Sequence, residues 1–130
     1  KFLDPIADKM LTTAAFLGFM VLGIGYGTVW ITFIVLLREF IVASVRMVAV
    51  SSGGKVIAAN IWGKLKTVAQ MVAIIFAMAA EQFKELCNIA VVSATLDVLT
   101  NVLLWASAVL CVISGVIYLI DNKEFIDTTK

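Results

Sequence analysis

Two aspartates near the start of the chain are spaced so that they could hold a metal ion. Asp4 and Asp8 are four residues apart, and a helix would stack them on one face about 5–6 Å apart. Carboxylate oxygens are the ligands that Mg²⁺ and Mn²⁺ prefer. The chain has no histidine, so acid–base chemistry would have to use carboxylates, lysines or water. A structural role is the alternative, because Asp4 before Pro5 is typical of a helix N-terminus, where Asp8 would complement the dipole.

A second group of charged residues lies inside an apolar stretch. Arg38 and Glu39 are adjacent, and Arg46 follows Glu39 by seven residues, so Glu39 and Arg46 share nearly the same face of a helix. Charged side chains are costly within a membrane span and usually face a partner or a polar cavity. The group therefore indicates either ion pairing between helices or a site that binds an anion or supports a metal.

A third group opens another apolar stretch with the sequence Gly63-Lys64-Leu65-Lys66-Thr67. The free N–H groups at a helix N-terminus favour anions, and nearby lysines strengthen that preference. The alternative is that Lys64 and Lys66 only anchor the helix at the membrane interface. The residue types predict an anion site here, but they leave this choice open.

The composition indicates that membrane helices position these residues. The chain has 130 residues, of which 62% are hydrophobic and 15% are charged, against roughly 45–50% and about 25% in a typical globular domain. Its mean hydropathy is +1.07. These values exclude a disordered chain, a disulfide scaffold and an ordinary soluble domain. The net charge of +1 indicates no nucleic-acid partner. Cys87 and Cys111 are predicted to be small buried apolar residues.

Four apolar runs predict four transmembrane helices in one domain, residues 1–130. Their expected bounds are about 4–24, 28–50, 60–80 and 96–120. Each run is long enough to span a bilayer, and continuous hydrophobicity favours helices over barrel strands. The lysines and arginines gather at the N-terminal end, around residues 51–66 and in the tail, so these parts are expected on the cytoplasmic side.

Polar and glycine-rich segments predict the connections between these helices. Residues 23–27 and 51–55 are rich in glycine and are expected to form turns. The polar stretch 81–85 is expected to end the third helix. Asp97 is expected to cap the N-terminus of the fourth helix.

Three motifs resemble the CDP-alcohol phosphotransferase family, whose signature reads D-x2-D-G-x2-A-R-x8-G-x3-D-x3-D. The segment KFLDPIADK at residues 1–9 is similar to the end of that signature, with Asp4 as its third aspartate and Asp8 as its fourth. The segments REF at 38–40 and WGKLKTVAQM at 62–71 resemble the phosphatidylglycerophosphate synthases of this family. The resemblance implies that two earlier helices and the first two aspartates precede Lys1. The chain would then be the C-terminal part of a six-helix bundle, inactive by itself.

The resemblance implies an enzyme of phospholipid biosynthesis in a bacterial cell membrane. The intact protein would transfer a phosphatidyl group from CDP-diacylglycerol to glycerol 3-phosphate, releasing CMP and forming phosphatidylglycerophosphate, the precursor of phosphatidylglycerol. Two divalent ions, Mg²⁺ or Mn²⁺, would bind the pyrophosphate and the aspartates. Asp4 would be a metal ligand, and Asp8 would be both a ligand and the general base on the acceptor hydroxyl. Related enzymes are often dimers, so a homodimer is the expected assembly.

The acceptor would bring its own phosphate, which fixed positive charge must hold. Arginine offers bidentate phosphate contacts and lysine offers a point charge. The candidates are Arg46, Lys64 and Lys66, with Thr67 as a hydrogen-bond donor, Arg38 as a second option and Glu39 in support. The alternative function is a membrane transporter or structural helical module, in which Arg38 and Glu39 would form a polar relay.

Overall fold

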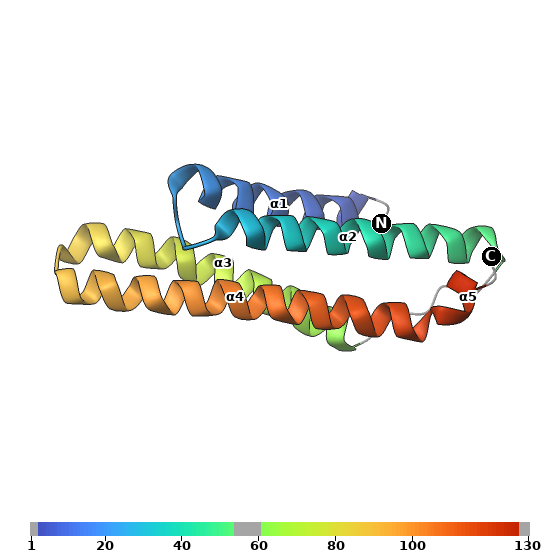
Figure 1. Ribbon diagram of the computed structural model, residues 1–130. Coiled ribbons are helices and arrows are strands. Elements are labelled where there is room, and N and C mark those ends of the chain that lie inside the picture. The colour runs from blue at the N-terminus through green and yellow to red at the C-terminus, as the bar shows by residue number, and fades with distance from the viewer. Residues whose placement is uncertain (1–2, 54–60, 128–130) are drawn as a thin grey trace.

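Helices joined by short turns make up the residues that the computed structural model describes, which are 3–53 and 61–127. The side chains of 3–6, 8, 125 and 126 are not among the described parts. The long helices are α1 (Leu3–Leu22), α2 (Thr28–Ser51), α3 (Ile61–Cys87) and α4 (Ala90–Asp121), and the short α5 (Lys123–Asp127) follows them (Figure 1). The predicted all-helical fold class is confirmed.

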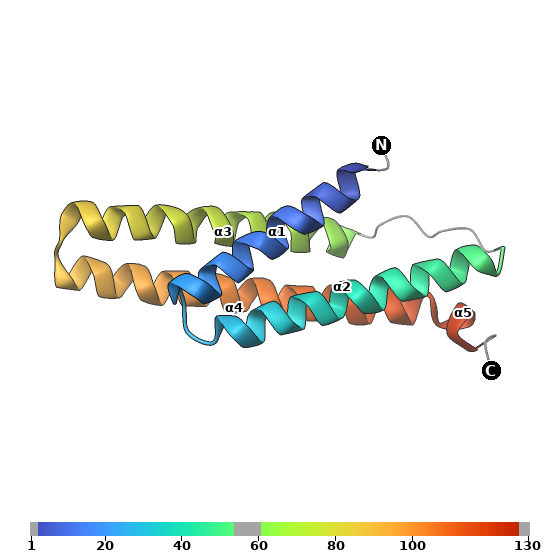
Figure 2. The same cartoon turned by 90° about the horizontal axis from the view of Figure 1, so that it is seen from above.

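The helices form two hairpins of unequal length. α3 and α4 pack together closely, α2 packs on α4, and the hairpin of α1 and α2 ends well short of the turn between α3 and α4 (Figure 1). Figure 2 shows α1 crossing obliquely over the space between α2 and α3. The start of α1, the end of α2, the start of α3 and the end of α4 all lie toward the same end of the molecule.

Glycines shape the turn between α1 and α2, as the sequence predicted. Gly23, Gly25 and Gly27 have φ values of 69°, 81° and 69°, a left-handed conformation that disfavours residues with a Cβ atom. A Cβ atom on Gly25 would lie 2.8 Å from Leu104 Cδ1. The turn is docked on α4, because Trp105 Nε1 donates a hydrogen bond to the carbonyl oxygen of Tyr26 at 3.1 Å.

Small residues allow the close packing of α3 against α4. Ala73 and Ala77 on α3 and Ala108 and Cys111 on α4 are at most 2% exposed and belong to one core cluster. Small side chains let helix backbones approach each other. The predicted burial is confirmed for Cys111 but is wrong for Cys87, which is exposed as the last residue of α3.

The expected connection at residues 81–85 is wrong, because α3 continues to Cys87 and α4 begins at Ala90. Asp97 is not the N-cap of α4, a position that Ile89 occupies. Lys84 Nζ instead contacts Glu81 Oε1 at 2.6 Å and donates to Asp97 Oδ1. These ion pairs satisfy the charges within and between the two helices, so the polar stretch stays helical.

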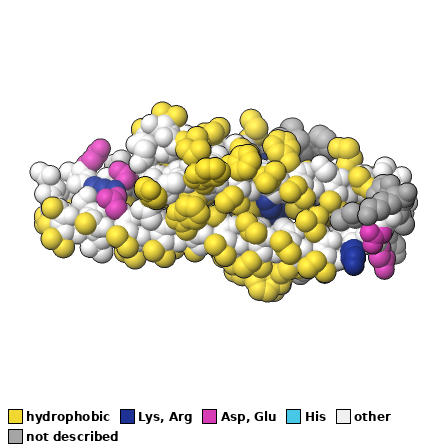
Figure 3. Space-filling view, viewed as in Figure 1, with side chains coloured by type: hydrophobic (Ala, Val, Ile, Leu, Met, Phe, Trp, Pro, Cys, Tyr) yellow, Lys and Arg dark blue, Asp and Glu magenta, His cyan; other side chains and the backbone are white. Residues whose placement is uncertain are grey.

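In the described part of the chain, two helices, α3 and α4, are long and apolar enough to cross a membrane, judged by length and composition. The apolar stretch of α1, Lys9–Leu22, is shorter. Hydrophobic side chains cover the middle of the face in Figure 3, and the acidic side chains visible there lie toward its two ends. Such a surface is typical of a protein in contact with lipid.

Substituting Gly25→Ala is expected to lower the stability of the turn. The left-handed backbone costs a residue with a Cβ atom about 1–2 kcal/mol, and the new methyl group would also crowd Leu104. The matched control is Gly18→Ala, because a Cβ atom on this helical glycine meets nothing within 4 Å and alanine favours helix by up to about 1 kcal/mol. Thermal melting in detergent should show a lower melting temperature for Gly25→Ala only. Equal melting temperatures for the two variants would contradict this account.

Candidate functional site

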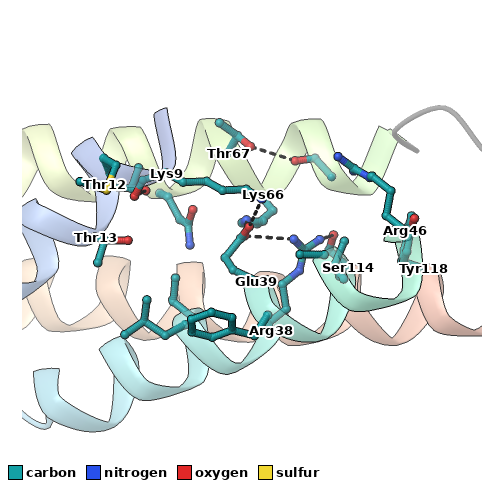
Figure 4. Close-up of a pocket in the computed structure, with 18 residues that line it drawn as sticks. Lys9, Thr12, Thr13, Arg38, Glu39, Arg46, Lys66, Thr67, Ser114 and Tyr118 are labelled. Atoms are coloured by element: carbon teal, nitrogen blue, oxygen red, sulfur yellow. Dashed lines mark hydrogen bonds and ion pairs between the residues drawn. The ribbon is translucent and has the colours of Figure 1, made fainter. Parts of the chain in front are cut away.

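A cavity of about 420 Å³ lies between α2 and α3, and residues of all four long helices line it (Figure 4). Among the described residues, no Cα atom of α2 lies within 8 Å of a Cα atom of α3. Both helices pack on α4 instead, which forms the floor. The polar residues of the lining are Lys9, Thr12, Thr13, Arg38, Glu39, Arg46, Lys66, Thr67, Gln70, Ser114 and Tyr118.

The carboxylate of Glu39 is the centre of an ion-pair cluster that joins three helices. Its Oε1 accepts hydrogen bonds from Arg38 Nη1 at 3.0 Å and from Lys66 Nζ of α3. Its Oε2 lies 3.7 Å from Lys9 Nζ of α1. The Lys66 and Glu39 side chains are 9% and 19% exposed. The cluster is therefore largely withdrawn from solvent, where charge pairs are strong but unpaired charges are costly.

Arg38 is also fixed to α4. Its Nη2 donates a hydrogen bond to Ser114 Oγ at 2.8 Å, and a Cβ atom on Gly115 would lie 2.9 Å from Arg38 Cγ. Glycine at position 115 thus lets the arginine lie against the α4 backbone. The pairing between helices that the sequence offered as one interpretation of Arg38 and Glu39 is present, and it forms one wall of the cavity.

Arg46, Lys66 and Thr67 also line the cavity, whereas Lys64 does not. Gly63, Lys66, Thr67 and Gln70 are three or four residues apart, so they share one face of α3. Lys64 is exposed on another part of the helix. Thr67 Oγ1 donates to the carbonyl oxygen of Gly63 at 3.1 Å (Figure 4).

Asp4 and Asp8 lie in the first two turns of α1, which begins at Leu3 and therefore includes Asp4 in the helix. Their side chains are outside the described residues. Within the described part of the chain, no group of three or more His, Cys, Asp or Glu residues could hold a metal ion. The helix nevertheless places residues 4 and 8 one turn apart along its backbone, and Lys9 after them lines the cavity.

The described lining carries four cations, Lys9, Arg38, Arg46 and Lys66, against the single carboxylate of Glu39. This surplus of positive charge favours an anion, and arginine together with lysine suits a phosphate. Lys9, Gln70 and Ser114 also line the cavity. The sequence motifs did not assign Lys9 or Ser114 to the site. Gln70 follows Lys66 by one helical turn, a spacing that the sequence itself shows.

Together, the helical fold and the apolar surface are typical of a membrane-associated protein, and the cationic cavity favours an anionic ligand. The profile of the CDP-alcohol phosphatidyltransferase family matches residues 1–119. The chain therefore belongs to this family, as its motifs indicated.

Individual relatives carry more specific names. The chain is 32% identical over 130 residues to a CDP-diacylglycerol--glycerol-3-phosphate 3-phosphatidyltransferase of Bacillus subtilis, covering 100% of this chain and 62% of the relative. It is 37% identical over 119 residues to a probable phosphatidylglycerophosphate synthase of Mycobacterium tuberculosis, covering 90% of this chain and 49% of the relative. The chain thus spans about half to three-fifths of the length of these curated relatives. No solved structure matches it significantly.

Replacing Glu39 by glutamine is expected to destabilise the protein. The substitution removes the only carboxylate among the described lining residues and leaves three cations without their shared partner. Loss of one member of a largely buried ion cluster should cost about 1–3 kcal/mol. The matched control is Glu85→Gln on the exposed part of α3. Thermal melting in detergent should separate the two variants, and an unchanged melting temperature for Glu39→Gln would contradict the structural role of the cluster.

Proposed function

We propose that the protein carrying this chain transfers a phosphatidyl group from CDP-diacylglycerol to glycerol 3-phosphate, forming phosphatidylglycerophosphate and releasing CMP. Membership of the CDP-alcohol phosphatidyltransferase family supports this class of reaction. The printed names of the Bacillus subtilis and Haemophilus influenzae relatives support the two substrates. The observation that carries the proposal is the cationic cavity between α2 and α3, because an acceptor that bears a phosphate needs such a site.

The acceptor phosphate would lie on Lys66 and Arg46. Lys66 brings a largely desolvated ammonium group into the cavity, and the exposed Arg46 lines it from α2. Thr67 lines the same wall as Lys66, and its hydroxyl can rotate to donate to the ligand. Arg38 contributes charge, but its guanidinium donates both to Glu39 and to Ser114. Lys66 also donates to Glu39, but its ammonium group has three donor hydrogens and can donate to a phosphate as well. Lys64 lies outside the lining and is a weaker candidate.

Asp4 and Asp8 would contribute to a site for Mg²⁺ or Mn²⁺, together with the two aspartates in the first half of the family signature. Their oxygen donors suit these ions, and two aspartates alone are an incomplete ligand set. When bound, a pair of divalent ions stabilises the attacking and leaving oxygens of a displacement. Asp8 would accept the proton of the acceptor hydroxyl as that oxygen attacks phosphorus.

The membrane arrangement is part of the proposal. α1 to α4 would be the last four spans of a six-helix bundle in a bacterial cell membrane, with the cavity opening toward the cytoplasm. An apolar groove of about 220 Å³ between α2 and α4, lined by residues such as Leu37, Ile41 and Val116, would take part of an acyl chain. A homodimer remains the expected assembly. The transporter alternative is less favoured, because Arg38 and Glu39 are tied to fixed partners.

The assay is CMP release from CDP-diacylglycerol by the full-length protein in mixed micelles. Release should require both glycerol 3-phosphate and Mg²⁺ or Mn²⁺. Asp8→Asn should lower turnover at least about 100-fold, since general bases contribute about 10²–10⁴-fold. Asp97→Asn is the matched control, because Asp97 lies in the first turns of α4, after the α3–α4 turn, and does not line the cavity. CMP release without an acceptor would contradict the proposed reaction, and retained turnover in Asp8→Asn would remove Asp8 from the role of base.

A further inference from the structure

We propose that Gln70 determines which acceptor the cavity accepts, by binding a hydroxyl group of a small polyol phosphate through its side-chain amide. This inference rests on the proposed function, and it extends that function from the phosphate to the neutral part of the acceptor. Gln70 lines the cavity and is 3% exposed, so its amide is held in a largely dry environment.

Among the described residues, the amide nitrogen of Gln70 has no hydrogen-bond partner. In the part of the chain that the structure describes, three buried side-chain polar atoms lack one: Arg38 Nε, Gln70 Nε2 and Thr100 Oγ1. Two of these three belong to residues that line the same cavity. A buried donor without a partner costs free energy, and folded proteins satisfy most such groups. An unpaired amide in the wall of a charged cavity therefore points to a ligand that completes it.

The position of Gln70 suits the end of the ligand away from the phosphate. It follows Lys66 by one turn of α3, which places the two Cβ atoms about 5–6 Å apart on one face. In Figure 4, Arg46 lies near the end of the cavity where α3 begins, and Lys9, Thr12 and Thr13 of α1 lie at the other end. Gln70 thus lies on the α1 side of Lys66, and α1 is the helix that carries Asp8.

The chemistry of an amide matches a hydroxyl better than it matches a phosphate. An amide offers both a donor and an acceptor, and a hydroxyl group needs both. The phosphate oxygens only accept, so the nearby cations suit them better. The terminal torsion of glutamine is soft, so the amide can turn either its nitrogen or its oxygen toward the ligand. A site built to bind a hydroxyl group strongly rejects analogues that lack it.

The test compares two ligands that differ only in their hydroxyl groups, glycerol 3-phosphate and n-propyl phosphate. Binding to the full-length protein in detergent is measured by calorimetry, which needs no turnover. The wild-type protein should bind glycerol 3-phosphate more tightly. Gln70→Met, which keeps the size of the side chain, should weaken glycerol 3-phosphate binding about tenfold, the worth of one hydrogen bond, and leave n-propyl phosphate binding unchanged. Without ligand, it should also melt at the same or a higher temperature, since an unpaired buried amide is gone.

The matched control is Thr100→Val, which removes the unpaired buried hydroxyl that lies outside the cavity lining. It should not lower the melting temperature, and both affinities should stay at wild-type values. The proposal would be overturned if Gln70→Met lost affinity equally for both ligands or lost affinity for neither. A lower melting temperature for Gln70→Met would also overturn it, because it would show that Gln70 has a structural role. Failure of the proposed function gives a different result: the wild-type protein would release no CMP, while the difference in binding between the two ligands would persist.

Discussion

The carboxylate of Glu39 pairs with cations from three helices, α1, α2 and α3. It does so across the space between α2 and α3, whose described backbones make no close contact. Without it, Lys66 and Arg38 would be like charges in a poorly solvated environment, where their repulsion is strong. With it, the lysine crosses toward α2 and the arginine stays against α4. One anion thus allows an excess of positive charge to be held next to apolar helices, and that excess is what a phosphate requires.

The surrounding helices supply the geometry that this cluster needs. Small residues such as Ala77 and Ala108 let α3 pack closely on α4, and α2 docks on α4 separately, so the two outer helices stand apart. The glycine-rich turn between α1 and α2 reverses the direction of the chain, and α1 crosses over the space between α2 and α3 (Figure 2). The cavity is therefore a consequence of helix packing, and the charged residues line it rather than create it.

Local patterns in the sequence predicted the helices and the glycine turn at residues 23–27, because apolar length and left-handed backbone conformations depend on neighbouring residues. The turn predicted at 51–55 lies partly outside the described residues. The sequence did not predict that α3 continues through residues 81–85. Lys84 pairs partly with Asp97 of the next helix, and a local pattern does not reveal a partner on another helix. The bond between Arg38 and Ser114 joins residues 76 positions apart, which no local pattern reveals. The choice between Lys64 and Lys66 depended on the rotation of α3, which packing against α4 determines.

The most direct test of the phosphate site is equilibrium binding of radiolabelled glycerol 3-phosphate to the full-length protein in detergent, with inorganic phosphate as competitor. The account predicts saturable binding that phosphate displaces, a loss of at least about tenfold in affinity for Lys66→Met and for Arg46→Met, and a much smaller loss for Lys64→Met. Wild-type affinity in the Lys66→Met and Arg46→Met variants, or a larger loss in Lys64→Met, would contradict the assignment of the cavity between α2 and α3 as the acceptor site.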